Sequence, residues 1–333
     1  MARAVQGIAV LGAGAWGTAL ALAAARAGRQ VTLWCRRPEQ AAALAESREN
    51  AAYLPGVTLP ESVTITSAAA DLAAAEATIL AVPAQRLRGV LQALEPQLSA
   101  GPAILAAKGI ELESGRLLDA VVAEALPGRP VAVLSGPTFA AEVAAGLPAA
   151  VTLATPEEAR GAALVQALGS ATFRPYWSGD VTGALVGGAV KNVVAIACGI
   201  VEGRGLGENA RAALVTRGLA EIGRLGAALG ARRETLMGLS GLGDLVLTAT
   251  SPQSRNYALG RRIGAGETLA AAQGHSRGVS EGVATAAAVV RLAAARSVEM
   301  PIAEAVEAVL HRGADIDTAV AGLLARPFKA ETH

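Results

Sequence analysis

Along the first half of the chain, short apolar runs alternate with longer stretches in which apolar residues recur with a helical period. The apolar runs have the length of buried strands, and they lie at residues 5–11, 31–35, 77–82, 103–107, 131–134, 149–154 and 172–176. Helices are predicted between several of them, at 18–27, 85–98 and 116–125. Strands that alternate with helices predict an α/β fold with a doubly wound sheet.

After residue 180 the strand-like runs stop, and helical patterns broken by glycines continue to residue 325. The sequence therefore predicts two domains. We place the sheet domain at residues 1–178 and a second, all-helical domain at residues 179–330, with a boundary near 176–181.

The first strand leads into the glycine turn Gly12-Ala13-Gly14-Ala15-Trp16-Gly17, and a helix follows directly. This order is that of the Rossmann-type dinucleotide fingerprint. Gly12 permits the tight turn, Gly14 lets the backbone approach a pyrophosphate, and Gly17 lets the helix lie close to the strand. The free N–H groups of the helix N-terminus favour phosphate. The alternative is a glycine turn that binds no ligand.

The end of the second strand bears on the choice of cofactor. NAD-binding domains usually carry an acidic residue there, which accepts hydrogen bonds from the ribose 2′-hydroxyl. This chain has Arg36 and Arg37 instead and no carboxylate. Because arginine binds phosphate through two parallel hydrogen bonds, we favour NADP(H), with NAD(H) possible. A solvated turn is the alternative interpretation of the two arginines.

Other strands of the predicted sheet end in residues that could line one crevice, since ligands of open α/β sheets bind beyond the carboxyl ends of the strands. Lys108 follows one strand, and Gly136, Pro137 and Thr138 follow another. An ordinary surface lysine is the competing interpretation of Lys108.

Lys191 stands in the middle of a helix of small and apolar residues that runs through Gly187-Gly188-Ala189-Val190. Burying an ammonium group without a partner costs far more than a helical turn contributes. The lysine therefore either extends to solvent or faces a cavity where its charge is used. These residues alone leave both possibilities open.

Two further groups of polar residues lie in the helical half of the chain. Asp244 follows the glycine-rich loop Ser240-Gly241-Leu242-Gly243, and Ser254, Arg255 and Asn256 stand in sequence. The trio suits a phosphate, because arginine offers a fork of donors and the other two add shorter ones. The alternative is a helix N-cap by Ser254 beside an exposed arginine.

Composition excludes several classes of protein. Hydrophobic residues make up 52% and charged residues 17% of the 333 positions, as in a globular protein. The net charge of +1 argues against general nucleic-acid binding. Two distant cysteines, Cys35 and Cys198, predict neither a disulfide framework nor a metal site. No apolar run is unbroken enough for membrane insertion, and the chain start lacks a signal-peptide pattern, so we expect a cytoplasmic protein.

Six motifs and the glycine turn together resemble bacterial-type NAD(P)-dependent glycerol-3-phosphate dehydrogenases, from that turn almost to the C-terminus. Besides that turn they are Lys108-Gly109, Ser135-Gly136-Pro137-Thr138-Phe139-Ala140, Gly188-Ala189-Val190-Lys191-Asn192, Gly241-Leu242-Gly243-Asp244, Ser254-Arg255-Asn256 and Glu281-Gly282. The resemblance implies reversible reduction of dihydroxyacetone phosphate to sn-glycerol 3-phosphate, which feeds glycerophospholipid synthesis. It also implies that the helical domain binds the substrate, with the site between the two domains, and that the protein is a homodimer.

The resemblance further implies roles for individual residues. Lys191 would be the catalytic acid and base. Substrate contacts would come from Lys108, Gly136, Thr138, Asp244, Ser254, Arg255 and Asn256. Cofactor contacts would come from Trp16, Arg36, Lys108, Ala140, Arg255, Val279 and Glu281. The family often has serine where this chain has Ala15, so one phosphate contact through a hydroxyl is missing from the expected set.

In the expected mechanism, a protonated Lys191 stabilises the developing alkoxide and donates a proton to it. Burial and a nearby Lys108 would lower the pKa of Lys191, and Asp244 would raise it. Two rivals stay open from the residues themselves. One is a β-hydroxy-acid dehydrogenase with a similar helical domain, against which the Ser254 trio and Lys108 speak. The other is an NADPH-sensing regulator without turnover, against which both lysines and Asp244 speak.

Overall fold

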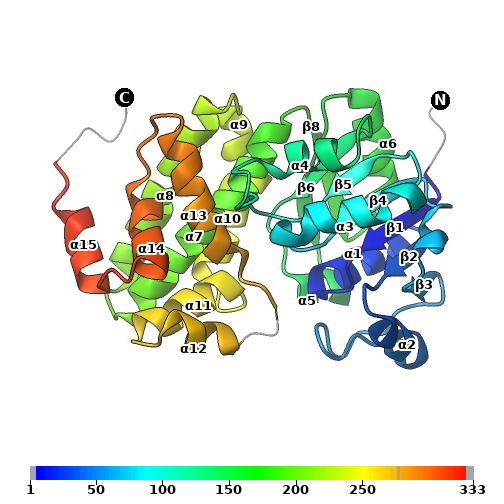
Figure 1. Ribbon diagram of the computed structural model, residues 1–333, viewed down its shortest axis with the longest axis horizontal. Helices are drawn as coiled ribbons and strands as arrows, with labels where there is room; N and C mark the ends of the chain where they lie inside the picture. The colour runs from blue at the N-terminus through cyan, green and yellow to red at the C-terminus, as the bar shows by residue number, and fades with distance from the viewer. Residues whose placement is uncertain (1–4, 276–277, 328–333) are drawn as a thin grey trace.

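The computed structural model describes residues 5–275 and 278–327 and has a sheet lobe beside a helical lobe (Figure 1). The sheet has eight strands in the order β3-β2-β1-β4-β5-β6-β7-β8. Neighbouring strands are parallel, except that β6 and β7 are antiparallel. The strands are β1 (Gly7–Leu11), β2 (Gln30–Trp34), β3 (Val63–Thr66), β4 (Ala77–Leu80), β5 (Ala103–Leu105), β6 (Val131–Ser135), β7 (Ala149–Ala154) and β8 (Phe173–Ser178). The predicted α/β class is confirmed.

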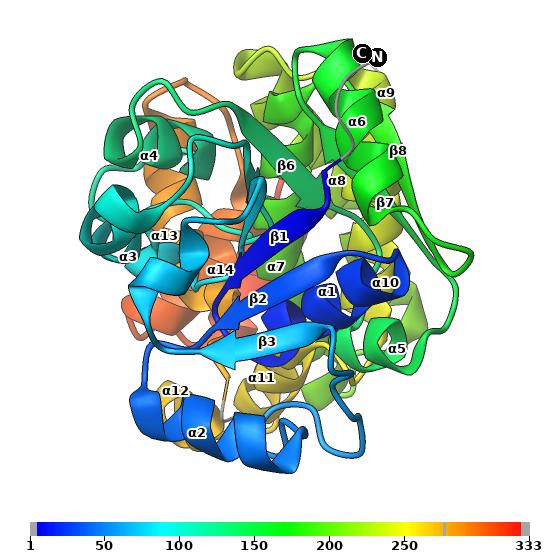
Figure 2. The ribbon, with the colours of Figure 1, turned by 90° about the vertical axis from the view of Figure 1, so that its right-hand side faces the viewer.

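Alternation along the strands divides the apolar residues between two covered faces. Ile8 and Val10 of β1 belong to one buried cluster, and Ala9 and Leu11 belong to another on the opposite face. The first cluster takes residues from α1 (Ala15–Arg26), α2 (Pro38–Ser47), α5 (Ala140–Ala145) and α6 (Glu158–Leu168). The second takes residues from α3 (Leu87–Leu94) and α4 (Leu118–Ala125). Figure 2 shows helices on both sides of the twisted sheet.

The helical lobe is built around α7 (Val181–Gly203), which is buried along nearly its whole length. Its surroundings are α8 (Glu208–Ala228), α9 (Arg233–Leu236), a π-helical turn η4 (Leu239–Gly243), α10 (Asp244–Thr250), α11 (Arg255–Gly264), α12 (Leu269–Gly274), α13 (Glu281–Ala294), α14 (Pro301–His311) and α15 (Ile316–Leu324). Among the helices described, α7 is the one long and apolar enough to cross a membrane, and its most apolar stretch is entirely buried inside the protein. It is thus the core helix of this lobe.

Glycines let α7 and α11 lie unusually close together. A Cβ atom at Gly199 would stand 2.1 Å from the carbonyl oxygen of Tyr257, and one at Gly260 would stand 2.1 Å from that of Ile196. Real side chains never approach backbone so closely, so this helix pair requires glycine at both places. The contact brings the start of α11, with its Ser254 trio, beside the middle of α7.

Candidate functional site

The glycine turn after β1 has the geometry that its spacing predicts. Gly12 has a φ of 106°, and a Cβ there would lie 2.9 Å from the carbonyl oxygen of Ala81. A Cβ at Gly17 would lie 1.8 Å from the Gly12 carbonyl oxygen, so the helix can approach the strand only without a side chain. A Cβ at Gly14 would meet no protein atom within 4 Å. The turn is therefore packed on the protein side and open where a ligand would approach.

Two polar side chains that the sequence did not single out brace this turn. Asn50 and Gln40 each donate a hydrogen bond of 3.1 Å to the carbonyl oxygen of Ala13. Asn50 also donates to the Thr18 hydroxyl at 2.7 Å and is fully buried. On the other side, the Trp16 indole donates to the Ala106 carbonyl oxygen at 3.2 Å, which ties the turn to the end of β5.

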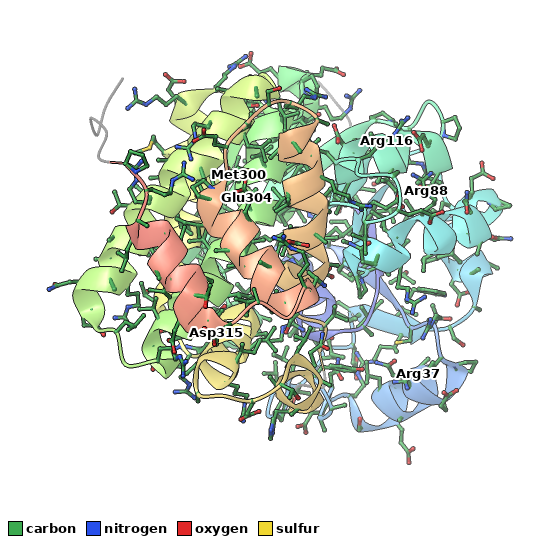
Figure 3. All side chains as sticks on the ribbon, turned by 60° about the vertical axis from the view of Figure 1, so that its left-hand side comes forward. Arg37, Arg88, Arg116, Met300, Glu304 and Asp315 are labelled. Atoms are coloured by element: carbon green, nitrogen blue, oxygen red, sulfur yellow. The ribbon has the colours of Figure 1, made fainter. Side chains whose placement is uncertain are left out.

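The two arginines after β2 differ in their surroundings. Both are exposed. Arg37 donates a weak hydrogen bond of 3.4 Å to Gln40 at the start of α2 and lies at the outer surface (Figure 3). The guanidinium group of Arg36 has no hydrogen-bond or ion-pair partner in the described part of the chain. Arg36 is thus the arginine whose donors are available to a ligand.

The carboxyl ends of β5 and β6 bring their loops together, as the sheet order requires. The Lys108 ammonium donates to the Gly136 carbonyl oxygen at 3.2 Å, and the Thr138 hydroxyl donates to the same oxygen at 3.2 Å. Gly136 has a φ of 152°, and a Cβ there would lie 2.9 Å from the Cα of Val151. Ala140 follows as the first residue of α5.

At the centre of the site, one carboxylate joins two lysines from different elements. Asp244, the first residue of α10, is completely buried. Its Oδ2 accepts from the Lys108 ammonium at 2.5 Å, and its Oδ1 accepts from the Lys191 ammonium. Lys191 also donates to the Thr248 hydroxyl at 2.7 Å. Lys191 therefore does not extend to solvent, and Lys108 is not a surface charge.

The pKa of Lys191 responds to these neighbours in the expected directions. Desolvation lowers it most, the Asp244 carboxylate raises it and the Lys108 ammonium lowers it, and together they bring the pKa to about 7. A lysine whose pKa lies near neutrality can both donate and accept a proton at physiological pH. Thr248 stands one helical turn after Asp244, at i+4, a spacing that could have identified it in the sequence.

The Ser254 trio is placed at the N-terminus of α11, beside α7. The Ser254 hydroxyl accepts from the Tyr257 N–H at 3.3 Å, so the helix N-cap considered as the alternative is present. Asn256 bridges two helices, because its amide donates to the Asn192 side chain at 2.9 Å and accepts from the Gly282 N–H at 3.1 Å. Arg255 is exposed, although crowding by protein atoms lowers its pKa.

Glu281, the first residue of α13, reaches across to the sheet lobe. Its Oε1 accepts from the Ala84 N–H after β4 at 3.1 Å, while its Oε2 is buried and makes no hydrogen bond within the described residues. Burial raises the pKa of Glu281 to about 7, against the Ala84 hydrogen bond and the positive charge of Arg255. Val279, just before it, is 50% exposed. Among the described residues there is no His, Cys, Asp and Glu cluster able to hold a metal ion.

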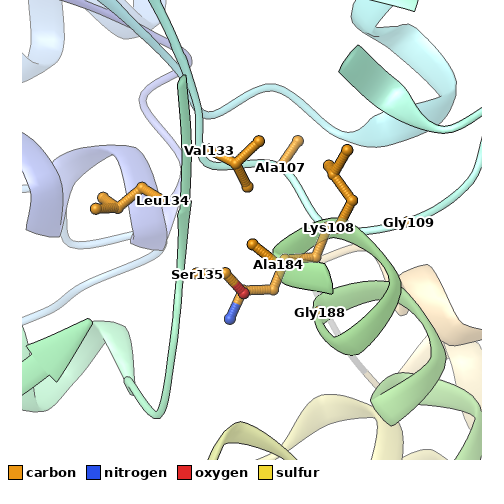
Figure 4. Close-up of a pocket in the computed structure, with 9 residues that line it drawn as sticks. Ala107, Lys108, Gly109, Val133, Leu134, Ser135, Ala184 and Gly188 are labelled. Carbon is orange, nitrogen blue, oxygen red and sulfur yellow. The ribbon is translucent and has the colours of Figure 1, made fainter. Parts of the chain in front are cut away.

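A small pocket lies behind Lys108, where α7 passes the ends of β5 and β6 (Figure 4). Its lining includes Lys108, Ser135 and Gly188. A Cβ at Gly188 would lie 2.8 Å from the Ser135 hydroxyl and 3.6 Å from Cγ of Lys108. The glycine therefore leaves space for the Ser135 hydroxyl, whereas a Cβ atom would meet Lys108 only at an ordinary van der Waals distance.

Comparison with known families matches both halves of the chain. The N-terminal model of NAD-dependent glycerol-3-phosphate dehydrogenase matches residues 7–160, and the C-terminal model of the same family matches residues 180–321. A glycerol-3-phosphate dehydrogenase [NAD(P)+] of Parvibaculum lavamentivorans is 56% identical over 333 residues, which cover 100% of both chains.

Solved structures agree with these matches. The crystal structure of glycerol-3-phosphate dehydrogenase from Coxiella burnetii has a TM-score of 0.93 and 41% identity, and the match covers 97% of this chain and 99% of that one. The yeast enzyme from Saccharomyces cerevisiae has a TM-score of 0.82 and 26% identity over 96% of this chain and 99% of that one. Both the sheet lobe and the helical lobe thus belong to one known arrangement.

Proposed function

Since this chain belongs to the NAD-dependent glycerol-3-phosphate dehydrogenase family, we propose that Lys191 is its catalytic acid and base. The reaction is the reversible NAD(P)H-dependent reduction of dihydroxyacetone phosphate to sn-glycerol 3-phosphate. The observation that carries the proposal is the buried ammonium of Lys191, held by Asp244 and Thr248 at the carboxyl ends of the strands. The rival β-hydroxy-acid dehydrogenase and the non-catalytic regulator are not favoured by the family match.

The glycine turn fits a dinucleotide, because Gly14 is open toward ligand and α1 begins without a side-chain cap on its N–H groups. The residues that would hold the cofactor are Gly12, Gly14, Ala15, Trp16, Gly17, Arg36, Arg37, Lys108, Ala140, Arg255, Val279 and Glu281. When bound, the reduced nicotinamide supplies the hydride. The backbone N–H groups of the first turn of α1 would bind the pyrophosphate, which offsets the missing hydroxyl at Ala15.

Protein groups in the cleft then act on the oxygen of the ketone. The protonated Lys191 donates a hydrogen bond to that oxygen and gives it a proton as negative charge develops. Asp244 orients Lys191, and Lys108 adds a second positive charge. Gly136, Thr138, Ser254, Arg255 and Asn256 complete the substrate set. Arg255 supplies the fork of donors for the phosphate, so the ketone is fixed relative to the proton donor.

The phosphate role of Arg255 can be tested with the variant Arg255→Ala and two ketones. The variant should raise KM for dihydroxyacetone phosphate by about tenfold or more, since charge-assisted hydrogen bonds contribute roughly 1.5–3 kcal/mol each. Turnover of unphosphorylated dihydroxyacetone should stay near the wild-type value. Equal loss on both ketones would contradict a phosphate contact.

The preference for NADP(H) rests on Arg36, whose donors have no partner among the described residues. Arg36→Ala should weaken NADPH binding and leave NADH binding nearly unchanged, by fluorescence titration. Arg37→Ala is the comparison variant and should weaken NADPH binding less, because Arg37 already interacts with Gln40. If both variants keep the wild-type ratio of NADPH affinity to NADH affinity, the cofactor preference does not come from these two arginines.

The remaining parts of the proposal concern the domain boundaries, the oligomeric state and the cellular location. We propose that the domains are residues 1–178 and 179–330, a division supported by the end of β8 at Ser178 and the start of α7 at Val181. We propose a cytoplasmic homodimer that feeds glycerophospholipid synthesis, without stable membrane insertion and without a nucleic-acid partner. Sedimentation velocity of the purified chain measures the dimer directly.

A further inference from the structure

One side chain crosses from the glycine turn to the chain segment that leads to Lys108. Trp16 lies in the first turn of α1, and its indole N–H donates to the carbonyl oxygen of Ala106 at 3.2 Å. The two residues are 90 positions apart in the chain, and Ala106 is almost completely buried. Lys108 follows Ala106 by two residues. The indole therefore holds the main chain immediately before a lysine that contacts Asp244.

The main chain on both sides of Lys108 is closely held. Before it, the N–H groups of Ala106 and Ala107 both donate to the carbonyl oxygen of Leu80, at 3.0 and 3.1 Å. After it, Gly109 has a φ of 148°, and a Cβ there would lie 3.1 Å from the nearest side chain. A buried carbonyl oxygen that loses a donor is destabilising, so without the indole N–H the segment should shift toward water or another donor. Lys108 would then move with it.

We propose that the Trp16 indole is a positioning group that sets the place of Lys108 in the site. This inference rests on the proposed function, in which Lys108 contacts the substrate beside Lys191. The main-chain N–H of Trp16 belongs to the first turn of α1, the proposed pyrophosphate site, while its side-chain N–H holds the segment before Lys108. One residue thus joins the cofactor end of the cleft to a charged group at the substrate end.

Withdrawal of Lys108 changes the proton donor in a definite direction. The Lys108 ammonium lowers the pKa of Lys191, and it shares the Asp244 carboxylate, which raises that pKa. The charged groups that face Lys191 are these two, and Thr248 is its neutral partner. When Lys108 withdraws, the repulsion weakens and the carboxylate is left to Lys191. Both changes raise the pKa of Lys191 above its value of about 7.

Trp16→Phe removes the N–H and keeps an aromatic ring, and Trp34→Phe is the matched control. The Trp34 indole also donates to a main-chain carbonyl oxygen, that of Ser67 at 3.1 Å, but at the β3 edge of the sheet. Single-turnover NADPH oxidation with saturating dihydroxyacetone phosphate is followed against pH. In Trp16→Phe the low-pH plateau should fall by roughly 10- to 100-fold, and the midpoint should move to higher pH. Trp34→Phe should change neither, and both variants should bind NADPH as the wild type does.

Trp16→His restores the donor, because the imidazole Nε2–H stands as many bonds from the backbone as the indole N–H does. It should recover most of the plateau and return the midpoint toward the wild-type value, although it fills less space than phenylalanine. Three results overturn the proposal. They are an unchanged plateau in Trp16→Phe, a lower plateau with an unshifted midpoint, and equal losses in the histidine and phenylalanine variants. If Trp16→Phe does not fold, Trp16→Met replaces it, since it also lacks the N–H.

Hydrogen exchange separates this inference from the proposed function, because it requires no turnover. In Trp16→Phe the amides of residues 106–109 should exchange about tenfold faster than in the wild type, and in Trp34→Phe at the wild-type rate. Wild-type exchange of this segment in Trp16→Phe overturns the positioning role even in an enzyme that reduces dihydroxyacetone phosphate. Faster exchange in Trp16→Phe together with a wild type that does not reduce this ketone would refute the proposed function instead.

Discussion

Asp244→Asn separates the charge of the carboxylate from its place in the site. The asparagine has nearly the same shape and keeps one oxygen that can accept from Lys191, but it removes the anion that raises the pKa of Lys191. Burial and the positive Lys108 stay in place, and both lower that pKa. The pKa of Lys191 must therefore fall in the variant, and the protonated form needed for reduction must be lost at a lower pH.

The size of the effect follows from the contact between the two charges. Unit charges about 4 Å apart interact by about 4 kcal/mol at an effective dielectric constant of about 20, which equals about three pKa units. The remaining amide interaction offsets part of this, so we expect a fall of about two to three units from a wild-type pKa of about 7. At pH 7 the single-turnover rate of reduction should fall by about 50- to 500-fold, and near pH 5 by much less.

The assay is the pH profile of single-turnover NADPH oxidation, with the enzyme in excess over NADPH. The rate should be flat below the pKa of Lys191 and should fall tenfold per pH unit above it. Thr248→Val is the matched control, because it removes the neutral partner of Lys191 without changing charge, and its profile should move far less. A lower rate at every pH with an unshifted midpoint would refute the assignment of the titrating group to Lys191.

Further predictions concern the fold and the cofactor turn. Gly17→Ala should lower both the melting temperature and the NADPH affinity, since its Cβ would overlap the Gly12 carbonyl oxygen. Gly14→Ala should lower only the NADPH affinity, which fluorescence titration measures. Equal melting temperatures for the two would contradict this. Glu221→Ala should cost about 2–4 kcal/mol in urea unfolding, because the N–H groups of Ile302 and Ala303 lose their buried acceptor. Burial raises the pKa of Glu221 to about 7, so stability should fall as pH rises from about 4.5 to 7, and Glu221→Gln should remove that fall.

The sequence predicted those parts of the fold that depend on residue type and on the spacing of apolar residues along the chain. The glycine turn, the strand bounds near Ala149–Ala154 and the change to helices after residue 180 all follow from residue type and period. Strand β3 was not predicted, since it has four residues and only Val63 is fully buried. The antiparallel pairing of β6 and β7 was not predicted either, because strand direction depends on the path of the connecting chain.

The site shows the same division. The family resemblance implied that Lys108, Lys191 and Asp244 share one site, and the sequence analysis predicted the directions in which burial, Lys108 and Asp244 move the pKa of Lys191. It could not predict that one carboxylate would use a separate oxygen for each lysine, because this depends on how α10 packs against α7 and the β5 loop. The bracing of the glycine turn by Asn50 was missed for the same reason, as its partner Ala13 lies 37 residues away.

The central claim is that Lys191 donates the proton that accompanies reduction of the ketone. Single-turnover oxidation of NADPH by Lys191→Met with saturating dihydroxyacetone phosphate tests it most directly, because methionine fills the same buried volume without a proton to give. The account predicts NADPH affinity within about twofold of the wild type and a rate lower by roughly 10²- to 10⁴-fold. A single-turnover rate within tenfold of the wild type, with NADPH bound normally, would contradict it.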